Sequence, residues 1–377
     1  MLPRVKINYL NGQLGTVPES EDGLFGLVGA TDGSWTLPEL YTPYTVVSVD
    51  DFVQQMGSIT EGLVPLKERI EQFYSIAPSG TKLVIYVPDE EVSAIVNDPK
   101  SAYGDFLREM GGKLRGLFVD LPHDNEGRTL EECAAKFQEL GEWAATELYS
   151  PLFSVLPSDS DEVSFASKKY NRVAIIAGSP EEGYGNNVGY LAGRLASIPV
   201  HRNIGRVKDG AIPSTEMWIG TDAVVPGLPQ ISSLHESRFI TPRTYVGLSG
   251  YYFADDCMAC DPTDDYAHLT ARRTVDKAYR IAYQTLVQFM LDEIEVNEDG
   301  TMQNGVLKSW QQAVENAINR QMTAKGELSA TDGEGCVCFI DPKQNVLATS
   351  RIELTLKVRP YGYARFIDVN LGFQVTA

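Results

Sequence analysis

Apolar and polar residues alternate strictly along the end of the chain. In residues 351–359 every second position is apolar, namely Ile352, Leu354, Leu356 and Val358. After the turn Pro-Tyr-Gly-Tyr a second alternating run follows, with apolar positions at Ile367, Val369, Leu371, Phe373 and Val375. A period of two predicts half-buried strands, so we expect a closing antiparallel hairpin. Its last strand is either an inner strand of its own sheet or an edge that another subunit completes.

A shorter alternating run lies near the other end of the chain. Val5, Ile7 and Tyr9 alternate with polar residues, and a stretch rich in glycine and acidic residues follows them. This pattern predicts a strand on a flexible arm over residues 1–22. Both ends of the chain are therefore expected to be strand-like arms.

Residues 23–262 alternate between short apolar runs and helical periodicity. Helices are predicted at 64–77 and 130–148, and the runs typical of buried strands are 24–29, 46–48, 83–87, 117–121, 153–156 and 173–177. Strands followed repeatedly by helices predict an α/β domain with a doubly wound, mostly parallel sheet. A further strand is expected at 244–248.

Residues 263–377 have a different pattern, which predicts a C-terminal α+β module. The stretch 266–295 contains neither proline nor glycine and predicts a long helix of roughly 40 Å. A second helix is expected at about 305–322, then a strand from Cys336 to Ile340, and then the closing hairpin that we expect to serve assembly.

Composition excludes several classes of protein. The chain has 377 residues, of which 43% are hydrophobic and 22% charged, as in ordinary folded proteins. The net charge of −19 argues against nucleic acid as a direct partner, because phosphate binding needs a surplus of lysine and arginine. No apolar run reaches ~18 residues and no signal peptide is evident. We therefore expect a protein that is made in the cytosol and does not insert into a membrane.

A glycine-rich loop, Gly183–Gly189, follows the strand predicted at 173–177. It is close to the dinucleotide-binding fingerprint, but its third glycine is one residue late. Glu181 and Glu182 in the same loop would repel a pyrophosphate. We interpret the glycines as a connection that lets a helix and a strand pack closely, and we expect no cofactor.

The five cysteines are too few, and odd in number, for a disulfide framework. Cys257 and Cys260 could be a redox pair, or could form a zinc site with Cys336 and Cys338. However, the neighbouring aspartates would raise thiol pKa values instead of activating the thiols. We therefore favour structural thiols and predict no metal site.

Neither the acidic run nor the histidines predict a catalytic centre. The aspartates from Asp255 to Asp265 lack the glycine and terminal glutamate of an EF-hand loop. We expect Asp264 or Asp265 to cap the long helix instead. The four histidines have no ligand spacing, and no nucleophile is placed with a base, so we expect no enzyme and no catalytic residues.

Basic residues cluster at the start of the long helix, at Arg272 and Arg273 and again at Lys277 and Arg280. Such a cluster can neutralise the aspartates that precede it. It can also meet an acidic patch on a neighbouring subunit. The sequence leaves both interpretations open.

Several motifs, taken in order, resemble contractile phage tail sheath proteins and the sheath-like proteins of related contractile injection systems. They are Gly26-Leu-Val-Gly29, Thr45-Val-Val-Ser48 with Asp51-Phe52, the stretch Asp264–Lys277, and the closing Pro-Tyr-Gly-Tyr-Ala-Arg-Phe-Ile. The resemblance covers the C-terminal third well and the first ~60 residues loosely.

The resemblance implies a structural protein of the virion tail, assembled in the cytoplasm of a bacterial host. Its subunits would form hexameric rings stacked around a tail tube protein and would contract during injection, with baseplate and terminator components as further partners. Terminal strands would pair with sheets in neighbouring subunits, so we expect subunit interfaces to include Val5, Ile7, Tyr9, Ile367, Val369, Leu371, Phe373 and Val375. We expect Arg272 and Arg273 there too, because their basic cluster could meet an acidic patch on a neighbour. The alternatives are a non-contractile tail or baseplate component of the same fold, and a nucleotide- or metal-dependent α/β enzyme.

Overall fold

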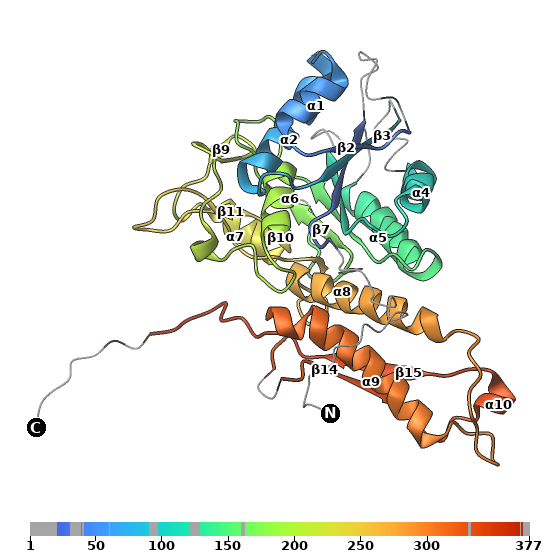
Figure 1. Cartoon of the computed structure of the whole chain (residues 1–377). Helices are drawn as coiled ribbons and strands as arrows, with labels where there is room; N and C mark the ends of the chain where they lie inside the picture. Colours follow the sequence, from blue (N-terminus) through green and yellow to red (C-terminus); the bar gives the residue numbers. More distant parts are fainter. Residues whose placement is uncertain are drawn as a thin grey trace, which may run out of the picture. The chain divides into compact units, whose positions relative to one another are not determined.

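A computed structural model of the chain describes residues 21–30, 39, 41–59, 61–89, 97–120, 129–159, 163–330, 333–369 and 371. The chain divides into two compact units, Met1–Glu295 and Val296–Ala377 (Figure 1). The strand predicted around Val5, Ile7 and Tyr9 lies outside the described residues.

A seven-stranded sheet forms the centre of the first unit. Its strand order is β10-β7-β5-β4-β1-β3-β2. The strands are β1 (Phe25–Ala30), β2 (Tyr44–Val46), β3 (Leu83–Asp89), β4 (Gly116–Asp120), β5 (Phe153–Pro157), β7 (Val173–Ile176) and β10 (Phe239–Ile240). All neighbours pair in parallel except β2, which runs antiparallel to β3 at one edge. The chain builds outward from β1 in both directions, which confirms the predicted doubly wound sheet.

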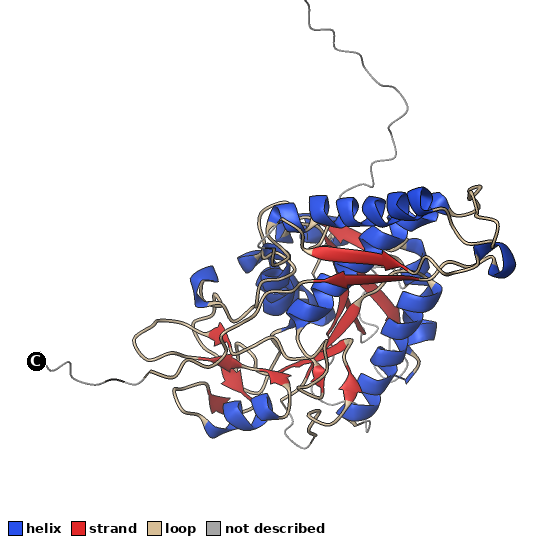
Figure 2. Ribbon diagram, turned by 90° about the horizontal axis from the view of Figure 1, so that it is seen from below, coloured by secondary structure: helices blue, strands red, loops and turns tan. Residues whose placement is uncertain are grey.

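Helices cover both faces of this sheet (Figure 2). Helix α6 packs on β4 and β5 and against α2, while α4 and α5 pack together and contact β3 and β5. The helices of the first unit are α1 (Val49–Met56), α2 (Val64–Ile76), α4 (Pro99–Glu109), α5 (Leu130–Glu147), α6 (Val188–Ser197), α7 (Pro229–Glu236) and α8 (Leu269–Leu286). No helix in the described part of the chain is both long and apolar enough to span a bilayer.

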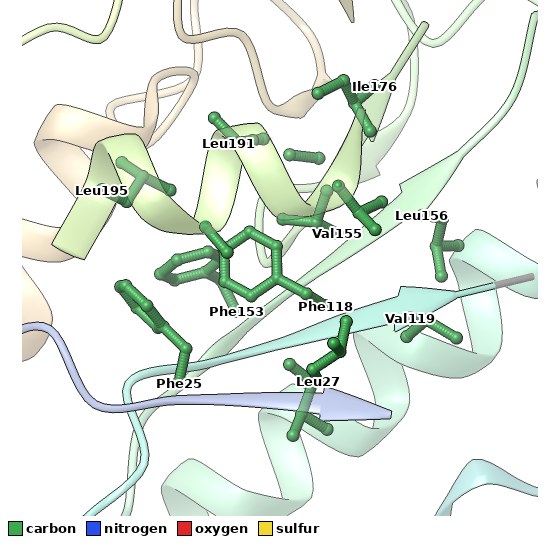
Figure 3. Packing of buried hydrophobic residues seen from close by; sticks show 14 of the residues in the cluster. Phe25, Leu27, Phe118, Val119, Phe153, Val155, Leu156, Ile176, Leu191 and Leu195 are labelled. Carbon is green, nitrogen blue, oxygen red and sulfur yellow. The ribbon is translucent and has the colours of Figure 1, made fainter. Parts of the chain in front are cut away.

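Aromatic residues of adjacent strands form the middle of the core. The rings of Phe25, Phe118 and Phe153 meet edge to face, with centroids 5.1–6.1 Å apart. Leu191 and Leu195 of α6 lie over them (Figure 3). Because the central strands β1, β4 and β5 are buried on both faces, their sequences are continuous apolar runs, which is why these strands were predictable.

Besides α7, β10 and the 3₁₀ turn Val207–Asp209, the regular structure of residues 199–260 consists only of two-residue strands outside the large sheet. Of these, β8 (Trp218–Ile219) pairs with β9 (Asp222–Ala223) and β11 (Pro242–Arg243) with β12 (Tyr252–Phe253), while β13 (Ala259–Cys260) pairs with the earlier β6 (Lys169–Tyr170). The strand predicted at 244–248 is wrong. This segment is a loop in which Val246 is 91% exposed, so its apolar residues do not reflect burial in a sheet.

The long helix is also shorter than predicted. Helix α8 ends at Leu286 and is followed by one 3₁₀ turn, Val287–Phe289. Beyond that turn Met290 and Leu291 are exposed, and Leu291 has a left-handed backbone (φ 65°). Helices in proteins persist where they bury a face, and this burial stops near Thr285.

The second unit contains α9 (Asn304–Gln321), β14 (Cys336–Ile340), the short α10 (Val346–Thr349) and β15 (Leu354–Val358). Helix α9 and both strands agree with the prediction. The closing hairpin does not, because β15 pairs antiparallel with β14, Cys338 opposite Leu356, and not with the run that begins at Ile367. Residues 359–369 instead have no regular structure.

Candidate subunit interface

The C-terminal segment, of which residues 359–369 and 371 are described, is exposed although it carries large apolar side chains. Phe366 is 89% exposed, Ile367 and Val369 are each 78% exposed, and Leu371 is 95% exposed. Phe373 and Val375 lie outside the described residues. An exposed apolar run of this kind is typical of a surface that another chain covers.

The two-stranded sheet of β14 and β15 has one covered face. Cys336, Cys338 and Ile340 are buried, and β14 packs against α9. On the opposite face Val337 and Phe339 are about half exposed. The sheet therefore offers apolar side chains on its outer face as well.

One edge of this sheet is closed by side chains of α9. The backbone N–H of Cys338 donates to Oε1 of Glu315 at 2.7 Å, and its C=O accepts from Nε2 of Gln311 at 3.0 Å. Gln311 and Glu315 lie one helical turn apart, so they reach the same strand residue. Two polar side chains thus occupy the N–H and C=O at the middle of the edge along which β14 could pair with another strand.

The other edge, along β15, is open. Since Cys338 directs its N–H and C=O away from β15, its partner Leu356 directs its own groups away from β14. The same geometry applies to Leu354 and Val358, two residues to either side. In the described part of the chain, nothing hydrogen-bonds to these outward groups of Leu356.

The root of the N-terminal arm is held by buried cations of α8. The carboxylate of Asp22 accepts hydrogen bonds from Lys277 Nζ and from Arg280 Nη2, the latter at 3.3 Å. Both basic side chains are at least nine-tenths buried. Arg115 Nε also donates to the backbone oxygen of Glu21 at 3.0 Å. The arm therefore begins from a fixed point on the first unit.

Arg272 and Arg273 are buried within their own unit. Arg272 donates to Asp276 at 2.7 Å and lies 4.3 Å from the centre of the Tyr266 ring. Arg273 donates to the backbone oxygen of Leu195 at 2.9 Å. These contacts favour an internal role for the two arginines over direct contact with a neighbour.

A different aspartate from the predicted ones caps α8. The carboxylate of Asp256 accepts from the backbone N–H of Thr270 at 2.8 Å, and His268 Nδ1 lies 3.0 Å from its other oxygen. Burial raises the pKa of Asp256, but these hydrogen bonds outweigh it, so its pKa lies below its usual range. Asp264 instead accepts from the backbone N–H of Tyr266 in a turn, and the prediction that Asp264 or Asp265 caps the helix is wrong.

The glycine-rich loop serves helix packing. A Cβ at Gly189 would overlap the backbone oxygen of Arg69, and one at Gly193 would lie 2.5 Å from that of Phe73. Both glycines belong to α6 and face α2, so they permit close contact between two helices instead of between a helix and a strand. Arg69 Nη1 also donates to the backbone oxygen of Asn186 in this loop at 2.8 Å.

The cysteine thiols are buried and unpaired with one another. Burial, with help from nearby carboxylates, raises the pKa of Cys260 to about 12 and the pKa values of Cys336 and Cys338 to about 11. Such thiols are poor nucleophiles, which supports the structural interpretation for these three.

Two family models match consecutive parts of the chain. Residues 2–257 match the model described as DUF2586, N-terminal domain, and residues 265–377 match DUF2586, C-terminal domain. The chain belongs to the DUF2586 family. The family division places α8 with the C-terminal part, whereas compactness places it with the first unit.

Relatives of this DUF2586 chain include a protein named "Putative tail sheath protein" from Haemophilus phage HP1 (strain HP1c1). The two are 26% identical over an alignment of 394 positions, which covers 98% of each chain. The similarity therefore extends from one end to the other.

Solved structures show that the fold is that of contractile sheath proteins. The helical sheath of the anti-feeding prophage in its contracted state has a TM-score of 0.71 at 14% identity, with 99% of each chain covered. The contracted sheath of an extracellular contractile injection system has a TM-score of 0.64 at 13% identity, with 100% and 98% covered. The sheath tail protein of Desulfitobacterium hafniense has a TM-score of 0.55 at 11% identity, with 94% and 100% covered.

Proposed function

We propose that this protein is the structural subunit of a contractile tail sheath. The observation that carries the proposal is full-length similarity, in sequence to a putative tail sheath protein and in fold to contracted sheaths. The subunits form hexameric rings around a tail tube, meet baseplate and terminator components, and belong to a virion tail assembled in the host cytoplasm. Contraction moves folded subunits relative to one another and needs no nucleotide.

The C-terminal segment is the first element that we propose for assembly. It extends as a strand along the open edge of β15 in a neighbouring subunit. There its backbone forms hydrogen bonds with the outward N–H and C=O of Leu356. Main-chain hydrogen bonds then hold the subunits together, while Ile367, Val369 and Leu371 become covered on one face. In the same way Phe373 and Val375 continue the strand.

A second strand comes from the N-terminal arm, with Val5, Ile7 and Tyr9 on one face. The ion pairs of Asp22 fix the place where this arm leaves the first unit. Contacts in which an arm of one subunit meets the sheet of the next are heterologous, and they produce helical polymers when they do not close.

Electron microscopy of the purified full-length protein tests the proposal. At high concentration we expect rings or tubes in negative stain. Deleting Asp368–Ala377 should leave a folded, soluble subunit that forms no tubes, and deleting residues 1–15 should weaken cohesion in the same assay. Tubes of normal length from the C-terminal deletion would contradict the role of this segment.

Point variants test whether assembly depends on the apolar face of the segment or only on its length. Ile367→Asp with Val369→Asp places charges on the face that we expect to become covered, whereas Asp368→Ser changes the intervening polar position. Tubes should be lost in the first variant and kept in the second. Equal assembly of both would contradict strand addition here.

A second candidate is a non-contractile baseplate component, since solved baseplate proteins of the anti-feeding prophage also match, with TM-scores of 0.66 and 0.61 at 15% and 10% identity. Such a protein would form rings that do not stack. Rings without tubes at every concentration would favour it over the sheath.

A further inference from the structure

Three potential metal ligands meet in the first unit. His235 lies in the last turn of α7, and Asp255 and Cys257 lie two residues apart after β12. One donor atom of each lies within 4.8 Å of the other two, and His235 Nδ1 is 4.0 Å from Cys257 Sγ. A chain segment of about twenty residues separates His235 from the other two, so only the fold brings them together.

The chemistry of this set suits one ion in particular. His235 supplies an imidazole nitrogen, a common zinc ligand in its neutral form, and burial, opposed in part by Asp255, lowers its pKa. A thiolate and a carboxylate would together balance the two charges of Zn²⁺, which matters because Cys257 is fully buried and Asp255 nearly so. Imidazole, thiolate and carboxylate are the ligands that zinc takes in proteins.

The separation of His235 and Cys257 is close to that of two ligands of a tetrahedral zinc ion. Typical Zn–N and Zn–S bonds of about 2.1 and 2.3 Å place the two donor atoms roughly 3.5 Å apart. The distance of 4.0 Å between His235 and Cys257 therefore needs a closure of only about half an ångström, within reach of side-chain rotation.

Neighbouring groups hold the carboxylate in place. Asp255 Oδ1 accepts from Asn203 Nδ2 at 2.6 Å and from the backbone N–H of Asp256 at 2.9 Å. Its other oxygen faces His268, whose Nδ1 is 4.0 Å away. Hydrogen bonds of this kind orient the ligands of metal sites. The fourth coordination position would fall to water.

We propose that His235, Asp255 and Cys257 form a zinc site that ties the end of α7 to the chain leading into α8. This site would stabilise a part of the first unit that has few long strands or helices. It is independent of the sheath role, because none of its residues belongs to the arms or to β15.

Metal analysis of the full-length protein tests the site. Protein purified from zinc-supplemented medium should contain about one zinc per chain by mass spectrometry, and removal of the metal should lower Tm by several degrees. Cys257→Ser and His235→Gln should each lose most of the metal. Cys260→Ser, a matched change at a buried cysteine three residues later, should keep it.

Cobalt substitution gives a second readout that does not depend on the variants folding. Co²⁺ added to the metal-free wild-type protein should produce a thiolate-to-cobalt charge-transfer band, absent from Cys257→Ser and present in Cys260→Ser. No band together with no zinc in the wild-type protein would overturn the proposal. So would zinc retained in full by Cys257→Ser.

Discussion

The carboxylate of Glu315 accepts a hydrogen bond from the backbone N–H of Cys338 at 2.7 Å. This contact places an acidic side chain of α9 on the edge of a β-strand where another strand would otherwise pair. Gln311 Nε2 donates a hydrogen bond to the C=O of the same residue. In the described part of the chain, β15 is therefore the edge of this sheet that is open to an added strand.

Replacing Glu315 tests whether its side chain keeps the β14 edge from pairing with another strand. Glu315→Ala leaves the N–H of Cys338 without its acceptor, so we expect the free energy of unfolding to fall by about 1–3 kcal/mol in urea titrations. We also expect more self-association in light scattering, because a second edge is now available. Asn316→Ala, an exposed change on the same helix, should alter neither quantity; the prediction fails if the two variants behave alike.

The contact between α2 and α6 depends on glycine. Gly189→Ala places a methyl group against the backbone of Arg69, and backbone atoms cannot move aside as a side chain can. We expect a loss of at least about 3 kcal/mol, measured by chemical unfolding, or failure to fold.

A matched control lies in α9. At Gly305 no atom lies within 4 Å of the added carbon, so Gly305→Ala should be neutral or stabilising by up to about 1 kcal/mol. A Gly189→Ala protein as stable as Gly305→Ala would show that the helices do not need this close approach.

The anchoring of the N-terminal arm depends on a buried cation. Lys277→Ala removes one of the two buried partners of Asp22, and we expect a loss of about 3 kcal/mol in thermal or chemical unfolding. Proteolysis near residue 22 should also become faster.

Lys82→Ala provides the comparison for this experiment. It breaks an ion pair with Glu21 in which both side chains are more than half exposed, so its cost should stay below about 1 kcal/mol. Equal effects of the two lysine substitutions would argue against anchoring by α8.

Stability should decrease in mildly acidic solution partly through His201. Burial and the positive charges of Arg202 and Arg273 lower the pKa of this histidine. The unfolded chain then binds a proton at higher pH than the folded protein does. The contribution of His201 is present above pH ~6.5 and is lost as the pH falls through the lowered pKa.

The corresponding measurement is unfolding by urea between pH 7.5 and pH 5. His201→Gln should show a weaker decline in the free energy of unfolding over this range than the wild-type protein. Parallel curves for the two proteins would rule out His201 as the group responsible.

Much of the first unit was predictable because burial on both faces leaves its strands uniformly apolar. The runs at Phe25, Leu83, Leu117, Phe153 and Val173 are all strands of the large sheet. Alternation in residues 351–359 likewise indicated which side chains turn inward. It could not indicate the partner strand, because a period of two shows which side chains share a face of the strand but not with which other strand it pairs.

Other features cannot be predicted from the pattern of apolar and polar residues. The buried face of α8 includes Arg272, Asp276 and Lys277, which a hydrophobic stripe would assign to solvent. Asp276 and Lys277 have partners from distant segments, Arg172 and Asp22, and Arg272 pairs with Asp276 on the same helix. The meeting of His235 with Cys257 was hidden for the same reason, since their separation along the chain matches no ligand motif.

The open edge of β15 has a consequence for stoichiometry. If every subunit offers one edge and one strand, each contact uses one of each, and a finite stack always ends with unfilled edges on one rim and unused strands on the other. Elongation then has a direction. A protein that stops growth at the rim with unfilled edges must supply a strand without offering an edge of its own.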